Sequence, residues 1–286
     1  YLPTTWKTVT AGFLRMYATP NVGSILVAGD LTITDVNDIT TRYPATVQWS
    51  QNFGLNQMPA TWEPTIANVA NQLEVPLRGA CIDAFAFNGQ FFLSSYWDTV
   101  VFSPLNYGTT SAPILGVRLF NQGRGMLTSN AWANTDRTIY GVDARDIWVF
   151  DGNDFTGLGN QRVKNYFYSN LNPNYTYLTF MVNNTSKNQI EIYYADLNST
   201  GFCNKMLAYR YDIDCWNPPR DDSSATFACE SPYWAYNSTT ANWEFDAASR
   251  TVVYAQGRPL QASFDQLHQK PSRGSPMNRC SGLRLR

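Results

Sequence analysis

The sequence predicts a mostly β fold, specifically a β-propeller-like array of antiparallel blades with one short helix. Aromatic and β-branched runs alternate with polar residues and are separated by Asn, Gly, Asp and Pro turns, which is the pattern of short strands. Strand pairs recur every roughly 40 to 55 residues, the spacing of propeller blades. A β-sandwich would contain the same short strands, but a lone helix and aromatic strand ends favour blades.

The N-terminal part of the chain alternates between strands and turns. Residues 24–34 read as two strands around a turn at Gly29-Asp30, because β-branched residues alternate on the far side of that dipeptide. A further strand is expected at 43–49. Residues 52–64, rich in Asn, Gly and Pro, are expected to form a loop.

The clearest hairpin lies within residues 85–102. Its turn is Asn88-Gly89, the dipeptide most typical of two-residue hairpins, and its second arm is expected to run on to Phe102. Residues 114–120 and 139–155 give the next strands. A second hairpin turn is predicted at Asp151-Gly152.

The periodicity becomes helical only between Asn160 and Leu171. Val163, Phe167 and Leu171 are spaced by four, as on one face of a helix, with Asn160 as the N-cap and Asn172-Pro173 as the stop. Strands are expected again at 177–183, 189–194 and 206–216, with two more around 225–228 and 250–255.

The sequence suggests three segments. Residues 1–45 are N-terminal strands that belong either to the first blade or to a truncated neighbouring domain, residues 46–257 form the propeller-like domain, and residues 258–286 form a basic irregular tail. This tail carries a net charge of +5 and the rest of the chain −6. It is either an arm that contacts an acidic neighbour or DNA, or a disordered end, the simpler interpretation. A boundary effect in the gene model would also explain it.

Composition excludes several classes of protein. A formal net charge of −1 argues against a general nucleic-acid binder, and no apolar run approaches the length of a membrane span. The five cysteines contain no Cys-x-x-Cys, so we expect reduced, buried thiols rather than a zinc site or a disulfide framework. The chain begins at Tyr1 rather than at methionine, so we expect a fragment or a processed product.

Catalytic motifs are absent from the sequence. His268 is the only histidine, which excludes histidine triads and histidine metal sites, and no phosphate loop or dinucleotide fingerprint occurs. We therefore predict no enzyme activity, with no catalytic, cofactor-binding or metal-binding residue. The segment 151–154 resembles the start of a calcium loop but lacks the downstream acidic ligand, so a hairpin turn is the better interpretation.

Two alternatives to a purely structural role remain. A propeller glycoside hydrolase or depolymerase would need paired carboxylates, for which the candidates are Asp143, Asp146, Asp212 and Asp214. Asp212 and Asp214 are two apart on an expected strand and would share a face. Solvated turn residues are the stronger interpretation of all four, with Arg145 as a local partner of the first pair.

Aromatic residues are the candidate interaction residues. The loops 52–64 and 218–234 are long, polar and aromatic, and are the predicted interfaces. The individual residues are Trp62, Tyr233, Trp234, Tyr236 and Trp243. The same aromatics could instead stack on sugars, which gives the second alternative, a carbohydrate-binding protein used for host attachment; core filling between sheets is the commoner role of such side chains.

Short motifs follow one another in a fixed order between residues 43 and 219, at 48–50, 62–64, 73–76, 147–152, 161–167, 187–194, 207–211 and 216. Their order resembles a family of tailed-bacteriophage virion proteins of the tail or neck, including the nozzle-type proteins of short-tailed phages and related proteins of marine cyanophages. No single element is specific, and their order carries the resemblance. The resemblance implies further domains around the propeller, which we expect to be absent or truncated here.

The resemblance implies a non-enzymatic assembly platform, a propeller within a ring of identical subunits. Its partners would be copies of itself and other tail or neck proteins. Genomic DNA in the lumen of the ring would be a further partner, and the net negative charge of the chain outside the tail is compatible with passage of that DNA. The expected location is the virion, after assembly in the host cytoplasm, with no membrane segment.

Overall fold

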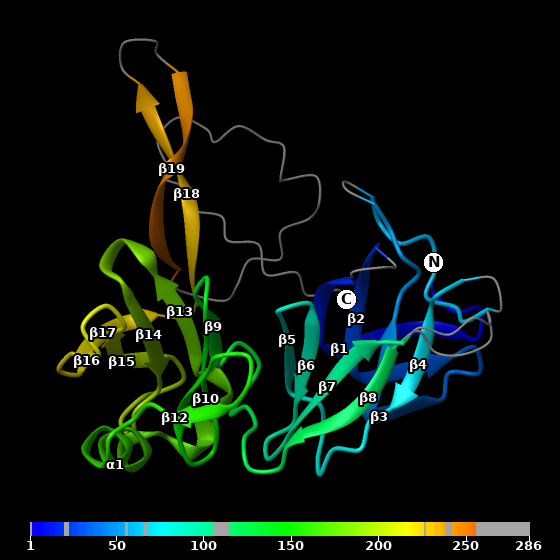
Figure 1. Cartoon of the computed structure of the whole chain (residues 1–286), viewed down its shortest axis with the longest axis horizontal. Helices are drawn as coiled ribbons and strands as arrows, with labels where there is room; N and C mark the ends of the chain where they lie inside the picture. The colour runs from blue at the N-terminus through cyan, green and yellow to red at the C-terminus, as the bar shows by residue number, and fades with distance from the viewer. Residues whose placement is uncertain are drawn as a thin grey trace. The chain divides into compact units, whose positions relative to one another are not determined.

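The computed structural model describes residues 2–19, 23–54, 57–65, 68–105, 115–225, 227–237 and 242–255, and between 222 and 255 it describes the backbone. This part of the chain is mostly β, with four antiparallel sheets, a separate two-stranded ribbon and a single α-helix (Figure 1). The four sheets are each built from consecutive strands, the arrangement of propeller blades. The predicted fold class is confirmed at this level, while closure of the sheets around an axis stays a prediction.

Two compact units divide the described chain. One contains residues 2–129 with 142–144, and the other contains residues 130–141 with 145–255. Each unit has its own buried hydrophobic clusters.

The first sheet has the strand order β1-β2-β3-β4. Its strands are β1 (Trp6–Thr19), β2 (Gly23–Asp35), β3 (Thr40–Trp49) and β4 (Asn71–Glu74). The boundary predicted between residues 45 and 46 falls inside β3, and β3 pairs with β2 on one side and β4 on the other. The described residues before position 46 therefore belong to the first sheet.

The turn predicted at Gly29-Asp30 is wrong, because β2 runs straight through these residues as one strand. Asp30 adopts a φ of 51° and forms a bulge, at which the pairing of β2 with β3 shifts register. The Asp30 carboxylate accepts hydrogen bonds from Arg42 Nε at 2.8 Å and Nη2 at 3.0 Å. A bulge turns the following side chains to the other face, so Val27 and Leu31 lie in different hydrophobic clusters.

The second sheet has the order β5-β6-β7-β8. Its strands are β5 (Asp83–Phe87), β6 (Gln90–Ser94), β7 (Thr99–Pro104) and β8 (Leu115–Asn121). The Asn88-Gly89 turn is confirmed, with φ values of 49° and 72° as a two-residue hairpin requires. The predicted long second arm is two strands, because the Ser95 hydroxyl accepts the Trp97 and Asp98 N–H groups, each at 3.1 Å, and ends β6.

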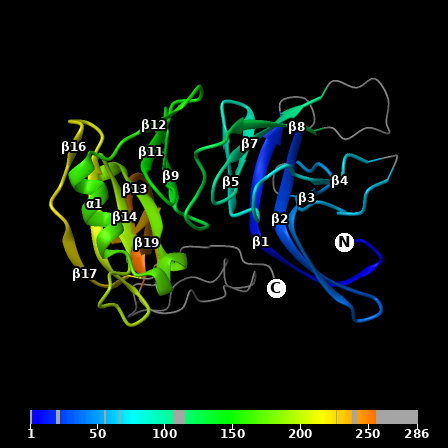
Figure 2. The same cartoon turned by 90° about the horizontal axis from the view of Figure 1, so that it is seen from below.

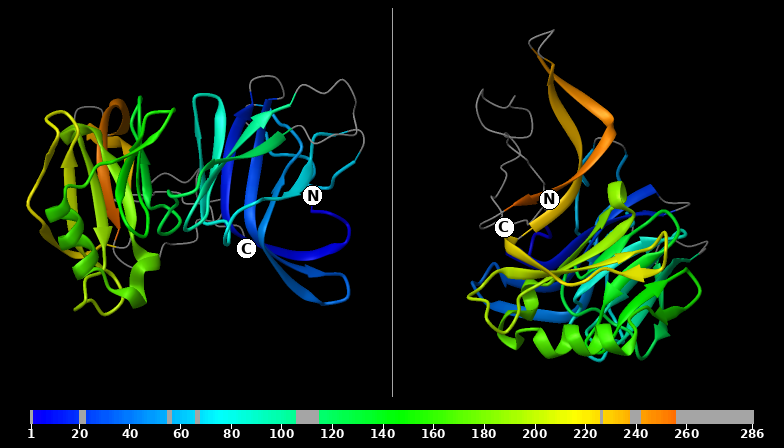
Figure 3. Two further views of the ribbon diagram at one scale, coloured as in Figure 1. Left: turned by 60° about the horizontal axis from the view of Figure 1, so that its bottom comes forward. Right: turned by 90° about the vertical axis from the view of Figure 1, so that its left-hand side faces the viewer.

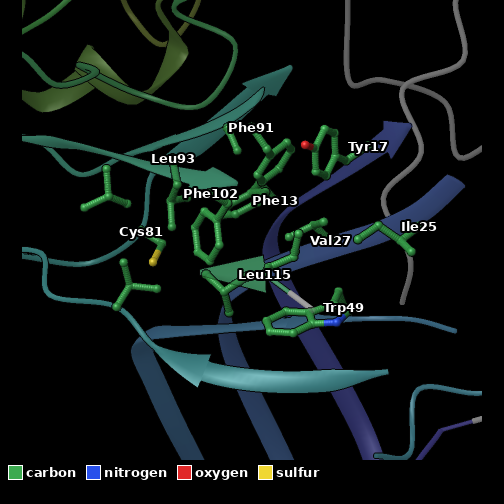
Figure 4. Packing of buried hydrophobic residues seen from close by; sticks show 14 residues of the cluster. Phe13, Tyr17, Ile25, Val27, Trp49, Cys81, Phe91, Leu93, Phe102 and Leu115 are labelled. Atoms are coloured by element: carbon green, nitrogen blue, oxygen red, sulfur yellow. The ribbon is translucent and has the colours of Figure 1, made fainter. Parts of the chain in front are cut away.

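The core of this unit lies between the first two sheets. The Tyr17 and Phe91 rings stack with centroids 5.2 Å apart, and Phe102 contacts Phe91 edge-on at 6.1 Å (Figure 4). At Gly29 a Cβ atom would lie 2.4 Å from the Phe13 ring, so only glycine allows Phe13 to enter this core.

The third and fourth sheets have the orders β12-β11-β10-β9 and β13-β14-β15-β16, with β17 also paired to β15. The third contains β9 (Trp132–Asn134), β10 (Ile139–Val142), β11 (Ile147–Phe150) and β12 (Phe155–Gly157). The fourth contains β13 (Phe180–Asn184), β14 (Gln189–Tyr194), β15 (Cys203–Arg210), β16 (Cys215–Trp216) and β17 (Arg220–Ala225). The strand predicted at 206–216 is interrupted, because Asp214 at φ 49° makes a turn.

The predicted helix is confirmed as α1 (Gln161–Asn170). Asn160 caps it, since its Oδ1 accepts the Val163 N–H at 3.0 Å. On the inner face Phe167 is fully buried and meets the Tyr194 ring edge-on at 4.9 Å, which packs the helix against the fourth sheet (Figure 2). Leu171 returns to extended backbone, and the 3₁₀ helix η1 (Pro173–Leu178) follows, so the next strand starts at Phe180 rather than at Tyr177.

A separate ribbon completes the described chain. It consists of β18 (Phe227–Asn237) and β19 (Asn242–Ala255), and it extends from its unit beside β13 (Figures 1 and 3). The strands predicted around 225–228 and 250–255 are one end of this longer pair. The predicted basic tail, residues 258–286, lies outside the described residues.

Candidate functional site

Four of the five predicted interaction residues lie on the ribbon, and its register brings three of them together on one face. Trp234 pairs with Phe245, and Tyr236 pairs with Trp243. Directly opposite residues of an antiparallel pair share a face, and so do residues two apart along a strand. Trp234, Tyr236, Trp243 and Phe245 therefore lie on one face of the ribbon, which we call the aromatic face.

The remaining predicted residue of the ribbon, Tyr233, falls on the opposite side. Tyr233 pairs with Asp246 and Ala235 pairs with Glu244, so this second face, the acidic face, carries two carboxylate residues. The sequence placed Tyr233 with the other aromatics. Neighbouring positions along a strand alternate between faces, which separates Tyr233 from Trp234.

A change of register divides the ribbon into two parts. Pro232 pairs with Arg250, and the next residue, Tyr233, pairs with Asp246, so β19 contains three additional residues at this point. Proline has no N–H to donate to a ladder, which suits a position at a bulge. The outer part, 233–237 with 242–246, is a two-stranded sheet to which no third described strand is paired.

Trp62 belongs to the other compact unit and packs against a hydrophobic cluster there. The cluster is formed by Ala28, Leu31 and Ile33 of β2, and Val9 of β1 packs against it as well. The Trp62 carbonyl accepts a hydrogen bond from the buried Gln48 side chain at 2.7 Å. Trp62 therefore supports the fold of the loop 52–64 while remaining half-exposed.

The first carboxylate pair of the hydrolase alternative is not assembled into a site. Oδ2 of the buried Asp143 lies 3.4 Å from Arg124 Nη1, whereas Asp146 Oδ1 lies 2.6 Å from Lys164 Nζ. The two acids belong to different compact units. Each acid therefore has a base from elsewhere in the sequence beside it.

The second carboxylate pair lies in the turn between β15 and β16, not on a strand. Arg210 donates to Asp212 Oδ1 at 2.9 Å, and this hydrogen bond lowers the pKa of the Asp212 carboxyl. Asp214 accepts from the Tyr209 hydroxyl at 2.7 Å. Desolvation, followed by this bond, raises the pKa of Tyr209. Both acids thus have local partners that fix the turn.

The segment that resembles a calcium loop is the predicted hairpin turn. Asp151 Oδ1 accepts the Asn153 N–H at 2.8 Å and the Asp154 N–H at 3.0 Å, and these bonds lower its pKa. Within the described ranges no cluster of three or more His, Cys, Asp or Glu residues could hold a metal ion.

A buried polar network on β14 was missed at the sequence level. Glu191 is fully buried, and its Oε1 accepts from Asn184 at 2.8 Å and from Gln189 at 2.5 Å, while Oε2 accepts from the Tyr193 hydroxyl at 2.8 Å. The alternation Gln-Ile-Glu-Ile-Tyr reads as a strand with a solvated polar face. In the structure this face is covered by buried aromatic residues. The Phe180 ring stacks on the Tyr193 ring, with centroids 4.8 Å apart.

A second missed cluster crosses the opposite face of the same sheet. Tyr194, Lys205 and Asp221 are cross-strand neighbours on β14, β15 and β17. Lys205 Nζ forms an ion pair with the Asp221 carboxylate and lies 3.9 Å from Oδ2 of the buried Asp196. The hydrogen bond to Asp221 raises the pKa of Lys205, and burial raises that of Tyr194. This is a network of mutually compensating charges at the sheet edge.

The three described thiols are free, as predicted, but the expectation that they are buried is wrong for one of them. Cys81 and Cys203 are buried, and Cys215 is exposed. Burial raises the pKa of the Cys81 thiol to about 12, which keeps it protonated and unreactive.

Comparison with known proteins adds little to this picture. No family model matches the chain, and no curated protein matches it. Among solved structures, a chain described as the AfRom2 CNH domain is similar with 9% identity and a TM-score of 0.31, covering 89% of this chain and 97% of that one. No described helix is long and apolar enough to cross a membrane.

Proposed function

We propose that this protein is a non-enzymatic structural component of a tailed-phage virion, acting at the tail or neck as an assembly platform that binds copies of itself and other virion proteins. The order of sequence motifs supports the phage assignment. The observation that supports the platform role is the outer part of the β18–β19 ribbon.

An isolated two-stranded ribbon is marginally stable in water. The outer ribbon pairs with no third described strand and has four aromatic residues on one face. Large aromatic residues are enriched in the cores of protein–protein interfaces. A ribbon of this kind gains stability by docking on another protein, which is the role expected of an assembly arm.

The candidate carboxylates favour this proposal over hydrolysis. Three of them, Asp143, Asp146 and Asp212, are ion-paired, and Asp214 accepts from a tyrosine hydroxyl. A retaining or inverting glycosidase needs two carboxyl groups that act on opposite sides of one bond. The ion pairs hold these acids in turns, so they serve the fold.

The test is the mass of the purified, untagged protein together with negative-stain images and its presence in purified virions. A closed ring or incorporation into virions is the expected result. Trp243→Ala, on the aromatic face, should reduce incorporation at least tenfold, because central aromatic anchors contribute roughly 2 kcal/mol or more to an interface. Trp97→Ala, at a half-exposed tryptophan of another sheet turn, is the matched control and should leave incorporation unchanged.

A stable monomer that is absent from virions would refute the proposal. Glycan-array binding that is lost in Trp234→Ala would then favour host attachment. Polysaccharide cleavage that is lost in Asp143→Asn or Asp212→Asn would favour a hydrolase.

A further inference from the structure

We propose that the open edge of β1 accepts β19 from a second copy of this chain by main-chain pairing, so that the outer ribbon extends the first sheet of its neighbour. This inference rests on the proposed assembly role and adds to it the two surfaces that meet and the identity of the partner.

The edge in question is the first half of β1. Among the described strands, β1 pairs with β2 on one side and is the last strand of its sheet on the other. In the second half of β1, Arg15 forms an ion pair with Asp83 of β5 at 2.6 Å and the Tyr17 hydroxyl bonds to the Gly89 carbonyl at 2.6 Å, so that half is covered by the second sheet. In the first half, Thr8, Thr10, Ala11 and Gly12 are exposed.

This half of the strand lacks the usual protection of an edge. Natural edge strands are blocked by charges, prolines, bulges or a covering segment, because alternate N–H and C=O groups of an edge are free to pair with another chain. Residues 8–12 contain no charge and no proline, and the irregularity of the β1–β2 pairing lies before them, between Trp6 and Thr8. The segment is therefore a ready template for one more strand.

The two faces of the ribbon match the two faces of this edge. On β1, Val9 packs against the cluster of Ala28, Leu31 and Ile33, while Thr8 and Thr10 lie on the other face. On β19, Trp243 and Phe245 lie on the aromatic face, and Glu244 and Asp246 lie on the acidic face. If β1 and β19 pair with these faces aligned, the aromatic residues of β19 continue the apolar face of the first sheet, and Glu244 and Asp246 lie beside the threonines.

The charges that flank the open half of β1 are already paired. Lys7 forms an ion pair with Asp38, and Arg15 forms one with Asp83 at 2.6 Å. Between these two residues the strand carries no charge, whereas the outer part of β19 carries two acids and no base. Thr8 and Thr10 therefore present no acid that would repel Glu244 and Asp246 when the two edges pair.

The contact uses a different surface on each copy. A contact of this kind is heterologous, and repeated head to tail it closes a ring when the rotation allows. It also gives the outer ribbon the additional strands that a two-stranded sheet needs for stability. The proposed subunit ring and the open edge thus have one explanation.

Cross-linking tests the contact directly. Two proteins carry Thr10→Cys or Glu244→Cys, each in a Cys215→Ser background that removes the one exposed thiol of the described residues, and they are mixed and oxidised. A disulfide-linked heterodimer joined through positions 10 and 244, identified by peptide mapping, is the expected product. Thr10→Cys mixed with Thr46→Cys, on a strand already paired on both sides, is the control and should give no such product. Equal yields in both mixtures would overturn the proposal.

Charge substitutions test it in solution. Thr10→Glu should reduce self-association at least tenfold by repelling the acidic face, whereas Thr10→Lys should retain it, and Glu244→Lys should rescue Thr10→Glu. Circular dichroism that matches the wild type for both Thr10 variants excludes unfolding as the cause. Rings that persist in Thr10→Glu would refute the edge contact and leave the platform function intact. A wild-type protein that is monomeric and absent from virions would refute both.

Discussion

Glu191 shows how a single buried side chain can link several residues of a sheet through its hydrogen bonds. Its carboxylate accepts from an asparagine, a glutamine and a tyrosine while fully buried. Hydrogen bonds to a charged acceptor are stronger than neutral ones. Because three donors converge on it, the position requires a group that only accepts.

Glu191→Gln should therefore destabilise the protein by about 2–3 kcal/mol, since the new amide NH₂ would face existing donors and leave buried groups unsatisfied. The urea midpoint measures this change. Glu74→Gln, at an exposed position of β4, is the control and should change the free energy of unfolding by less than about 0.5 kcal/mol. An equal, small effect of both substitutions would show that the network contributes little.

The raised pKa of the Cys81 thiol predicts that the free energy of unfolding falls at alkaline pH. Its pKa is 9.0 ordinarily and about 12 in the folded protein, so the thiol is protonated in both states below pH 9. Between these values the unfolded chain loses the proton and the folded chain keeps it, so stability falls as pH rises through this window. Burial also raises the pKa of Tyr17, Tyr194 and Tyr209, which acts in the same direction.

The measurement is the urea midpoint between about pH 8 and pH 11, where linkage predicts a progressive decrease. Cys81→Ala removes one titrating group and should make the decrease smaller. Cys215→Ser, at an exposed thiol, should leave it unchanged. Identical pH profiles for Cys81→Ala and the wild type would contradict the assigned role of Cys81.

At the scale of elements, α1 depends on its N-cap. Asn160→Ala removes the bond to the Val163 N–H and should cost about 1 kcal/mol in free energy of unfolding. Asn160→Asp keeps an accepting oxygen at the cap and should retain stability. Thermal or urea unfolding measures both, and equal losses in the two variants would mean that the cap bond is not the source of the effect.

Elements set by local chemistry were predictable from the sequence, and those set by tertiary pairing were not. The helix of Asn160 and the hairpin of Asn88-Gly89 depend on residues within one turn, and both are confirmed. Gly29-Asp30 has the same turn chemistry, but β1 and β3 pair on both sides of β2 and make it a bulge. The strand after Phe85 divides at Ser95 because that hydroxyl accepts two N–H groups, which periodicity does not encode.

The candidate site follows the same rule. Aromatic residues of the ribbon were identifiable from composition, but their faces depend on the register of β18 with β19, which separates Tyr233 from Trp234. The carboxylates paired in sequence have different partners, because Asp143 lies beside Arg124 and Asp146 beside Lys164, 19 and 18 residues away. Glu191 remained unnoticed because its burial depends on what covers the sheet.

For the whole molecule, the division into two compact units predicts two steps of unfolding. Leu93, in the cluster between the first two sheets, and Ile192, on β14 of the other unit, are both fully buried. Substitution of either by alanine removes comparable apolar volume and should cost about 2–5 kcal/mol in its own unit. Units with separate cores need not unfold together.

Scanning calorimetry of the wild type should accordingly resolve two transitions. Leu93→Ala should lower the midpoint of one of them and leave the other in place, and Ile192→Ala should do the reverse. The pair is its own control, because each variant tests the independence of the unit that it does not alter. A single transition that moves with either substitution would mean that the two units unfold as one cooperative body, and the assembly arm would then share its stability with the first sheet.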